Sequence, residues 1–124
     1  MYRKFGQFIN GKWQSSANKE TYNVINPATE EIIGEASKAS LADVDKALKS
    51  AEKGFEVWKK IKPWERSKII RKIADEIRKK SKIFANWMTL ETGKTLAEGE
   101  AEVSAAADIF EWNAEETKRI YGQS

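Results

Sequence analysis

Apolar and polar positions alternate over short runs in the first third of the chain, a pattern typical of β-strands. Residues 8–9 and 12–13 flank Asn10-Gly11, the dipeptide favoured in a two-residue type I′ hairpin turn. A second pair of apolar runs, residues 22–25 and 31–36, is joined by an Asn-Pro turn. We expect two short hairpins or one small meander here.

At Ser40 the apolar period changes from two to about 3.6, the period of a one-sided α-helix. The Ser40 side chain can accept a hydrogen bond from a free amide, and Asp43 places negative charge at the positive end of the helix. Apolar residues then recur at spacings of three and four: Leu41, Val44, Ala47, Leu48, Ala51, Phe55 and Trp58. The helix over 41–58 therefore needs a partner for its apolar side.

Two further helices are expected. Pro63 suits a first helical position, and Thr92-Gly93 provides a stop, so one helix of about 28 residues and roughly 42 Å is predicted over 63–91. Its apolar side consists of Ile69, Ile70, Ile73, Ile77, Phe84, Trp87 and Met88. The last helix begins at Thr95, where Thr-Leu-Ala-Glu repeats the capping pattern, and runs toward Gly122.

The composition is that of one soluble globular unit. The 124 residues are 40% hydrophobic and 33% charged, which is unlike a disordered or fibrous chain. No Cys and no His are present, so thiolate nucleophiles, disulfides and the commonest general base and metal ligand are missing. No signal peptide and no apolar run of membrane-spanning length occur, and we expect a cytoplasmic protein with no membrane partner.

Charge is segregated along the chain. Residues 59–82 carry a net charge of +8 and residues 83–124 carry −5, whereas residues 1–58 are neutral. The basic run, with neighbouring tryptophans, suits a nucleic-acid surface in one interpretation. In the other it is a solvated helix face that pairs with the acidic C-terminal helix. We favour the second and expect no nucleic-acid partner.

No spacing in the sequence specifies a reaction. Gly93-Lys94-Thr95 matches the end of a phosphate-binding loop, but Met88 occupies the position of that motif's first glycine, so a helix–turn–helix junction is favoured. No G-x-G-x-x-G dinucleotide motif occurs. The clustered carboxylates Glu98, Glu100 and Glu102 are interpreted as solvated charge, because an acid–base pair needs two different environments.

Four short motifs, read in order, carry a family resemblance. They are Phe8-Ile9-Asn10-Gly11-Lys12-Trp13, Asn26-Pro27-Ala28-Thr29 with Ile33-Gly34, Trp64-x-Arg66, and Leu90-Glu91-Thr92-Gly93-Lys94. They resemble the N-terminal portion of the NAD(P)-dependent aldehyde dehydrogenase superfamily through nearly the whole chain. The motifs Phe110-Glu111-Trp112, Ala114-Glu115-Glu116, Lys118-Arg119 and Tyr121-Gly122 are most similar to the succinate-semialdehyde dehydrogenase branch.

The resemblance implies a place in a larger enzyme. As an isolated segment we expect an α+β fold, with β-hairpins in 1–39 and three helices in 40–122. In a complete family member residues 1–124 are part of the α/β Rossmann-like cofactor-binding domain. The family oxidises aldehydes through a Cys thiolate, with NAD or NADP as hydride acceptor. Its nucleophile, general base and oxyanion donors lie downstream, so no catalytic or cofactor residue, and no cofactor for this chain alone, is expected.

Two weaker site expectations follow from the resemblance. Glu91 and the main-chain carbonyl of Ile25 match positions that hold a structural monovalent cation in several members, although Glu91 has the alternative of contacting its own helix end. Phe110 and Asn113 match the wall of the substrate tunnel. The succinate-semialdehyde branch usually has an aromatic residue at Asn113 and Pro at Thr95, so the substrate stays open.

Two functional hypotheses remain. In the first, the chain is the N-terminal segment of an aldehyde dehydrogenase for succinate semialdehyde, inert alone, whose partner is the remainder of that enzyme. In the second, it is a stand-alone helical interaction module or gene remnant. Helices that lack the sheet they cover expose apolar faces, so we expect the isolated chain to form a homo-oligomer.

Overall fold

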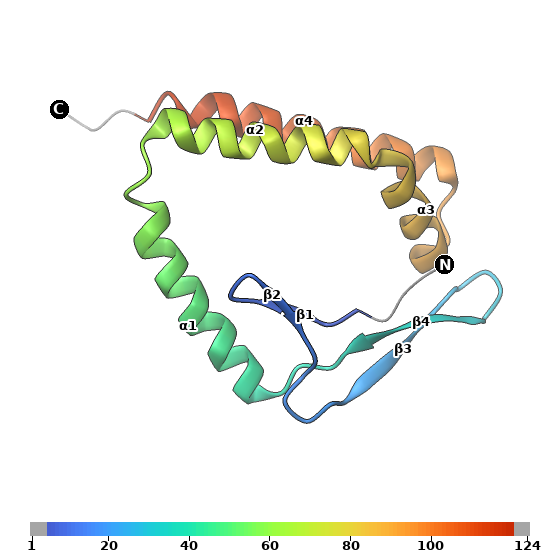
Figure 1. Cartoon of the computed structure of the whole chain (residues 1–124). Helices are drawn as coiled ribbons and strands as arrows, with labels where there is room; N and C mark the ends of the chain where they lie inside the picture. The colour runs from blue at the N-terminus through green and yellow to red at the C-terminus, as the bar shows by residue number, and fades with distance from the viewer. Residues whose placement is uncertain (1–4, 121–124) are drawn as a thin grey trace. The chain divides into compact units, whose positions relative to one another are not determined.

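The computed structural model describes residues 5–120, which divide between two compact units, Met1–Lys59 and Lys60–Ser124 (Figure 1). The first unit contains β1 (Gln7–Ile9), β2 (Lys12–Gln14), β3 (Thr21–Ile25), β4 (Ile32–Ser37) and α1 (Leu41–Trp58). The second contains α2 (Pro63–Lys79), α3 (Ser81–Thr92) and α4 (Leu96–Thr117). The α+β class is confirmed; residues 5–120 contain four helices instead of the three expected, and two compact units instead of the one that the composition predicts.

The β1–β2 hairpin forms as its turn sequence predicts. Asn10 and Gly11 both have positive φ, 53° and 74°, which is the backbone that a type I′ turn requires. The strands are antiparallel with Phe8 opposite Trp13, and the two rings lie 5.3 Å apart between centroids. Cross-strand aromatic packing therefore stabilises a hairpin that has only three residues in each strand.

The β3–β4 hairpin is a separate sheet, so two hairpins form and no meander. The Asn26 side chain accepts a 2.9 Å hydrogen bond from the Ala28 amide, which closes the Asn-Pro turn. A register shift lies between Val24 and Ile25. Phe5 adds a parallel bridge beside Ala36 on the outer side of β4.

The start of α1 is fixed by one buried carboxylate. Asp43, 3% exposed, accepts hydrogen bonds from the Ser40 amide at 3.0 Å and the Ser40 hydroxyl at 2.7 Å, and its own amide donates to that hydroxyl. This is the expected capping box. Asp43 also accepts from the Ala17 amide at 3.0 Å, so it ties the β2–β3 loop to the helix. The Ala17 and Ser40 amides lower the pKa of Asp43 from 3.8 to about 2.

The expected single helix over 63–91 is wrong, because it breaks at Lys80. α2 begins at Pro63 as predicted, but Lys80 leaves helical geometry at φ −105° and ψ 13°, and α3 starts afresh at Ser81 and departs from the axis of α2 (Figure 1). The turn brings Ala85 of α3 against Gly99 of α4, where an added Cβ would lie 3.1 Å from the Ala85 carbonyl oxygen. Tertiary packing thus overrides local helix propensity here.

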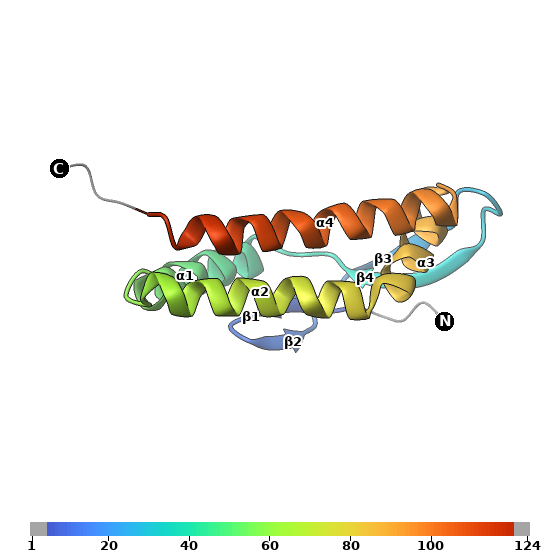
Figure 2. The same cartoon turned by 90° about the horizontal axis from the view of Figure 1, so that it is seen from above.

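α2 and α4 run antiparallel and side by side (Figures 1 and 2). Their buried contacts are small residues one heptad apart: Ser67 and Ala74 on α2, Ala107 and Ala114 on α4. Small side chains let the two backbones approach closely. The buried residues of the second unit, within the described part of the chain, are therefore small, and Val103 is the largest of them.

The remaining helix ends agree with the sequence in part. Gly93 has a left-handed φ of 75° and ends α3, and Thr95 caps α4. α4 ends at Thr117, short of the expected run toward Gly122; Tyr121-Gly122 lie outside the described residues. Across residues 5–120, no helix combines the length and apolar character needed to cross a membrane.

Candidate functional site

The second unit presents an apolar groove on the side of α2 and α3. One cavity of about 340 Å³ is lined by Ile69, Ile73, Ile77 and Phe84. It adjoins a cavity of about 500 Å³, because Ile77 and Phe84 line both. Trp87, Met88, Val103 and Ala106 complete the apolar wall of the larger one. The apolar positions that the sequence places on one helix therefore form a groove shared by three helices.

This groove is open to solvent. Ile69 and Ile73 are 43% and 41% exposed, although both are large aliphatic residues on the apolar stripe of α2. Exposed aliphatic side chains gathered in one groove mark a contact surface in most soluble proteins. The geometry thus offers a surface for docking another polypeptide segment.

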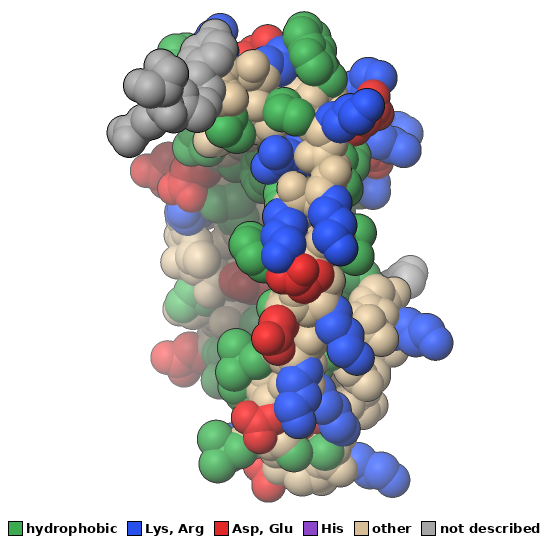
Figure 3. Space-filling view, turned by 90° about the vertical axis from the view of Figure 1, so that its left-hand side faces the viewer, with side chains coloured by type: hydrophobic (Ala, Val, Ile, Leu, Met, Phe, Trp, Pro, Cys, Tyr) green, Lys and Arg blue, Asp and Glu red, His purple; other side chains and the backbone are tan. Residues whose placement is uncertain are grey.

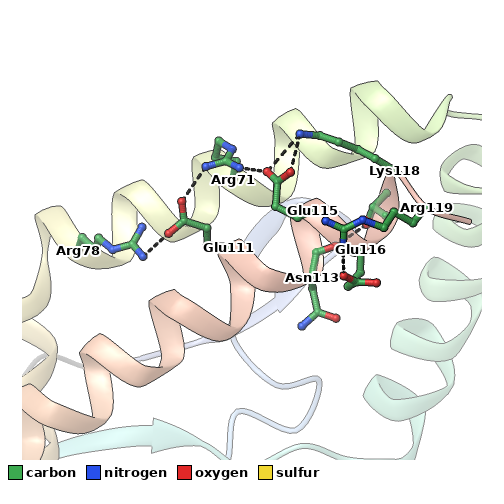
Figure 4. Close-up of polar contacts among 9 residues, drawn as sticks. Arg71, Arg78, Glu111, Asn113, Glu115, Glu116, Lys118 and Arg119 are labelled. Carbon is green, nitrogen blue, oxygen red and sulfur yellow. Dashed lines mark hydrogen bonds and ion pairs between the residues drawn. The ribbon is translucent and has the colours of Figure 1, made fainter.

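Charged residues join α2 to α4 in an alternating series (Figure 4). Arg71 contacts Glu111 at 2.7 Å and also Glu115, and Arg78 contacts Glu111 at 2.5 Å and Asp108 at 2.8 Å. The hydrogen bond from Arg78 lowers the pKa of Glu111. Part of the basic segment therefore pairs with the acidic C-terminal helix, as the second interpretation of the charge pattern expects.

The Gly93-Lys94-Thr95 junction uses its polar groups internally. The Lys94 ammonium contacts the Glu102 carboxylate at 2.6 Å. The Thr95 hydroxyl accepts from the Glu98 amide at 3.3 Å and donates to the Glu98 carboxylate at 3.0 Å. The amide and hydroxyl of Thr95 lower the pKa of Glu98. The helix–turn–helix interpretation is confirmed, because α3 ends just before this lysine and α4 begins just after it.

The two residues matched to a substrate tunnel lie one turn apart on α4. Phe110 is partly exposed, and Asn113 is exposed with its side-chain amide donating to the Ile109 carbonyl at 2.8 Å. Asn113 points away from the ion pairs that connect α4 to α2 (Figure 4). Both residues are thus free to contribute to another surface.

The two residues matched to a cation site belong to different units. Ile25 ends β3 in the first unit and is half exposed. Glu91 lies in the last turn of α3 in the second unit, at the edge of the larger cavity. No group of three or more carboxylates within residues 5–120 is arranged to hold a metal ion. The cation site stays a prediction.

Comparison with known proteins decides the family. The model of the aldehyde dehydrogenase family matches residues 13–124. The chain belongs to the aldehyde dehydrogenase family. This aldehyde dehydrogenase chain is 39% identical, over 94% of its length, to the glutarate-semialdehyde dehydrogenase of Pseudomonas putida. It is 37% identical, over 92% of its length, to the succinate semialdehyde dehydrogenase of Acinetobacter baylyi.

Solved structures agree with this assignment. HpcC from Thermus thermophilus superposes on this aldehyde dehydrogenase chain with a TM-score of 0.95 at 31% sequence identity. The superposition includes 98% of this chain and 24% of the HpcC chain. Betaine aldehyde dehydrogenase from Staphylococcus aureus, in complex with NAD⁺, superposes with a TM-score of 0.92 at 34% sequence identity. This superposition includes 95% of the present chain and 24% of the betaine aldehyde dehydrogenase chain. The chain spans about a quarter of the length of both semialdehyde relatives, and it matches their N-terminal segment.

Sequence reasoning expected the basic segment to pair with the acidic C-terminal helix but named no individual ion pair, and it missed the second role of Asp43. The signal for the ion pairs is present: Arg71 and Arg78 are seven residues apart on one face of α2, opposite acidic residues spaced by three and four on α4. The Asp43 contact with Ala17 has no local signal, because the two residues are 26 positions apart.

Proposed function

We propose that this chain forms the N-terminal part of the cofactor-binding domain of an aldehyde dehydrogenase that oxidises succinate semialdehyde, or its glutarate homologue, to the carboxylic acid with NAD or NADP. The observation that carries the proposal is the open groove of Ile69, Ile73, Ile77 and Phe84. A helix pair with such a groove is built to cover another layer of structure. The semialdehyde relatives support the substrate class.

The chemistry of this reaction needs groups that these 124 residues do not contain. With no Cys, the chain has no thiolate to attack an aldehyde carbon. The sequence also has no glycine-rich motif of the type that holds the pyrophosphate of a nicotinamide cofactor. We therefore assign no residue of this chain to the cofactor and expect no NAD(P)H formation from the chain alone.

A chimera tests the proposal. This chain replaces the matched segment of the Pseudomonas putida glutarate-semialdehyde dehydrogenase, and NAD(P)H formation is followed with succinate and glutarate semialdehydes. We expect activity from the chimera and none from the truncated relative that lacks the segment. A matched variant carrying Ile69→Asp and Ile73→Asp is expected to lose activity and assembly, because charge enters the apolar groove. A folded but inactive chimera contradicts the proposal.

The site residues enter the same proposal. Phe110 and Asn113 would contribute to the tunnel wall, so Asn113→Ala in the chimera is expected to change the KM ratio of the two semialdehydes and leave assembly intact. The Glu91 carboxylate and the Ile25 carbonyl are hard oxygen donors, which suit a monovalent cation. Replacement of potassium by choline is then expected to lower the melting temperature of the chimera, and Glu91→Gln to remove that difference.

The same groove favours a second candidate, a stand-alone interaction module whose partner is another copy. Burial of the isoleucine side between two chains would remove apolar surface from water without any other polypeptide. Analytical ultracentrifugation of the chain alone separates the outcomes. A dimer that Ile73→Asp dissociates supports the module, and a stable compact monomer at high concentration contradicts it.

A further inference from the structure

The first unit contains a cavity with a basic wall, between the β1–β2 hairpin and α1. Its volume is about 350 Å³. Lys12 reaches it from β2, and Lys46, Lys49 and Lys53 reach it from α1. Asn10 and Gln14 of the hairpin and Ser50 of α1 are the neutral polar residues that line it. Ile9 is the one apolar residue among those that line it, which distinguishes this cavity from the groove in the second unit.

The lysines converge because of two regular spacings. Positions 46, 49 and 53 are separated by three and four residues, so they share one face of α1. Lys12 is paired with Ile9 across the hairpin, immediately after the type I′ turn. The sequence thus brings four lysines from two elements to the wall of one cavity. Figure 3 shows basic side chains gathered along one side of α1, with acidic ones beside them.

These charges have no carboxylate partner within the part of the chain that the structure describes. Elsewhere in those residues lysines do form ion pairs: Lys38 contacts Glu20 at 3.2 Å, and Lys94 contacts Glu102 at 2.6 Å. Lys12, Lys46 and the two lysines that follow on α1 take part in none of the described ion pairs.

In the described residues, the acidic side chains of α1 form no ion pair with these lysines. Asp43 is occupied by the amides of Ala17 and Ser40, and Glu56 is paired with Lys59. Neither Asp45 nor Glu52 lines the cavity. Like charges at spacings of three and four repel each other on a helix, and a bound anion would reduce the repulsion among these three lysines.

We propose that this cavity is a binding site for a small anion with two linked phosphate groups, of the inorganic pyrophosphate type. Lysine ammonium groups are compact charges suited to phosphate oxygens, and a concave basic wall raises the local concentration of anions. The volume lies within the range of small-molecule sites. No aromatic residue lines the cavity, so the site recognises the phosphates and offers no surface on which a base would stack. This inference does not rest on the proposed function.

Calorimetric titration of the 124-residue chain with sodium pyrophosphate tests the site. The test variant carries Lys46→Gln, Lys49→Gln and Lys53→Gln. The control variant carries Lys60→Gln, Lys62→Gln and Lys72→Gln, which removes the same charge from exposed lysines of the second unit. We expect the first to raise the Kd for pyrophosphate roughly tenfold and the control to leave it unchanged. Circular dichroism confirms that both variants keep the fold of the parent.

Two further measurements separate this site from general attraction of anions. Lys12→Gln alone is expected to weaken binding by roughly threefold, because the hairpin contributes one of the four charges. Inorganic phosphate is expected to bind more weakly than pyrophosphate. Equal loss in the control variant, or no effect of Lys12→Gln, overturns the proposal. Displacement of pyrophosphate by single-stranded oligonucleotides with affinity that grows with their length also overturns it, in favour of a nucleic-acid surface.

Discussion

Replacement of Gly99 by alanine tests how closely α3 and α4 are packed. A Cβ at this buried position would lie 3.1 Å from the carbonyl oxygen of Ala85, 3.3 Å from its Cα and 3.4 Å from its Cβ. The first two atoms belong to the backbone of α3, so the helix must shift by a few tenths of an ångström to make room. Overpacking of this kind costs about 1–3 kcal/mol.

The cost competes with a gain. Alanine is more favourable than glycine inside a helix by about 1 kcal/mol. We therefore expect Gly99→Ala to lower the free energy of unfolding of the second unit by about 1 kcal/mol net. Gly54 in α1 is the matched control, because no atom beyond its neighbours in the chain and the adjacent backbone of its own helix lies within 4 Å of an added Cβ there. Gly54→Ala is expected to stabilise α1 by the full difference in helix propensity between alanine and glycine.

Hydrogen exchange measured by mass spectrometry reports on α1, α3 and α4 separately in each variant. We expect faster exchange of α3 and α4 amides in Gly99→Ala and slower exchange of α1 amides in Gly54→Ala. Urea unfolding followed by circular dichroism supplies the free-energy difference. If Gly99→Ala protects α4 as much as Gly54→Ala protects α1, the close approach at Ala85 is not a constraint and the reasoning fails.

Two electrostatic predictions follow from the same structure. The pKa of Asp43 is about 2 in the fold against 3.8 ordinarily, so its carboxylate stabilises the first unit above its ordinary pKa, and this contribution is lost as the pH falls toward 2. Asp43→Asn should remove this part of the pH dependence of the unfolding free energy, which urea midpoints measured from about pH 5 to about pH 2 would show. Midpoints that fall with pH in parallel for the variant and the parent would contradict the prediction. Arg71→Gln with Arg78→Gln should lower the urea midpoint of the second unit at low salt and have less effect at about 1 M salt, because partly exposed ion pairs are screened. An equal loss at both salt concentrations would show that the arginines act through packing.

Local chemistry predicted most of the element boundaries. Asn10-Gly11 specified a turn with two positive φ values, Ser40 and Thr95 specified helix starts, and Gly93 specified a helix end. Each of these signals acts within four residues, so the sequence alone contains it. These boundaries are predictable because short-range hydrogen bonds determine them.

The break at Lys80 could not be predicted in the same way. Residues 77–83 contain no Gly or Pro, and the turn between α2 and α3 accompanies the contact of Ala85 with Gly99, 14 positions away. The groove could not be predicted from the sequence either. Its wall combines apolar residues of α2 and α3 with Val103 and Ala106 of α4, which only the tertiary fold brings together. The sequence gives the net charge of the first unit but not the cavity that Lys12 shares with three lysines of α1. Lys12 lies at that cavity because of the hairpin turn.

The antiparallel contact of α2 and α4 has a consequence for synthesis on the ribosome. Its buried residues and ion pairs all lie between Ser67 and Lys118, so the pair can assemble as soon as this stretch has left the exit tunnel. At that moment the isoleucine side of α2 faces water. The nascent chain would then expose an ordered helix pair with apolar side chains in water, and transiently exposed apolar surface of this kind is prone to aggregation.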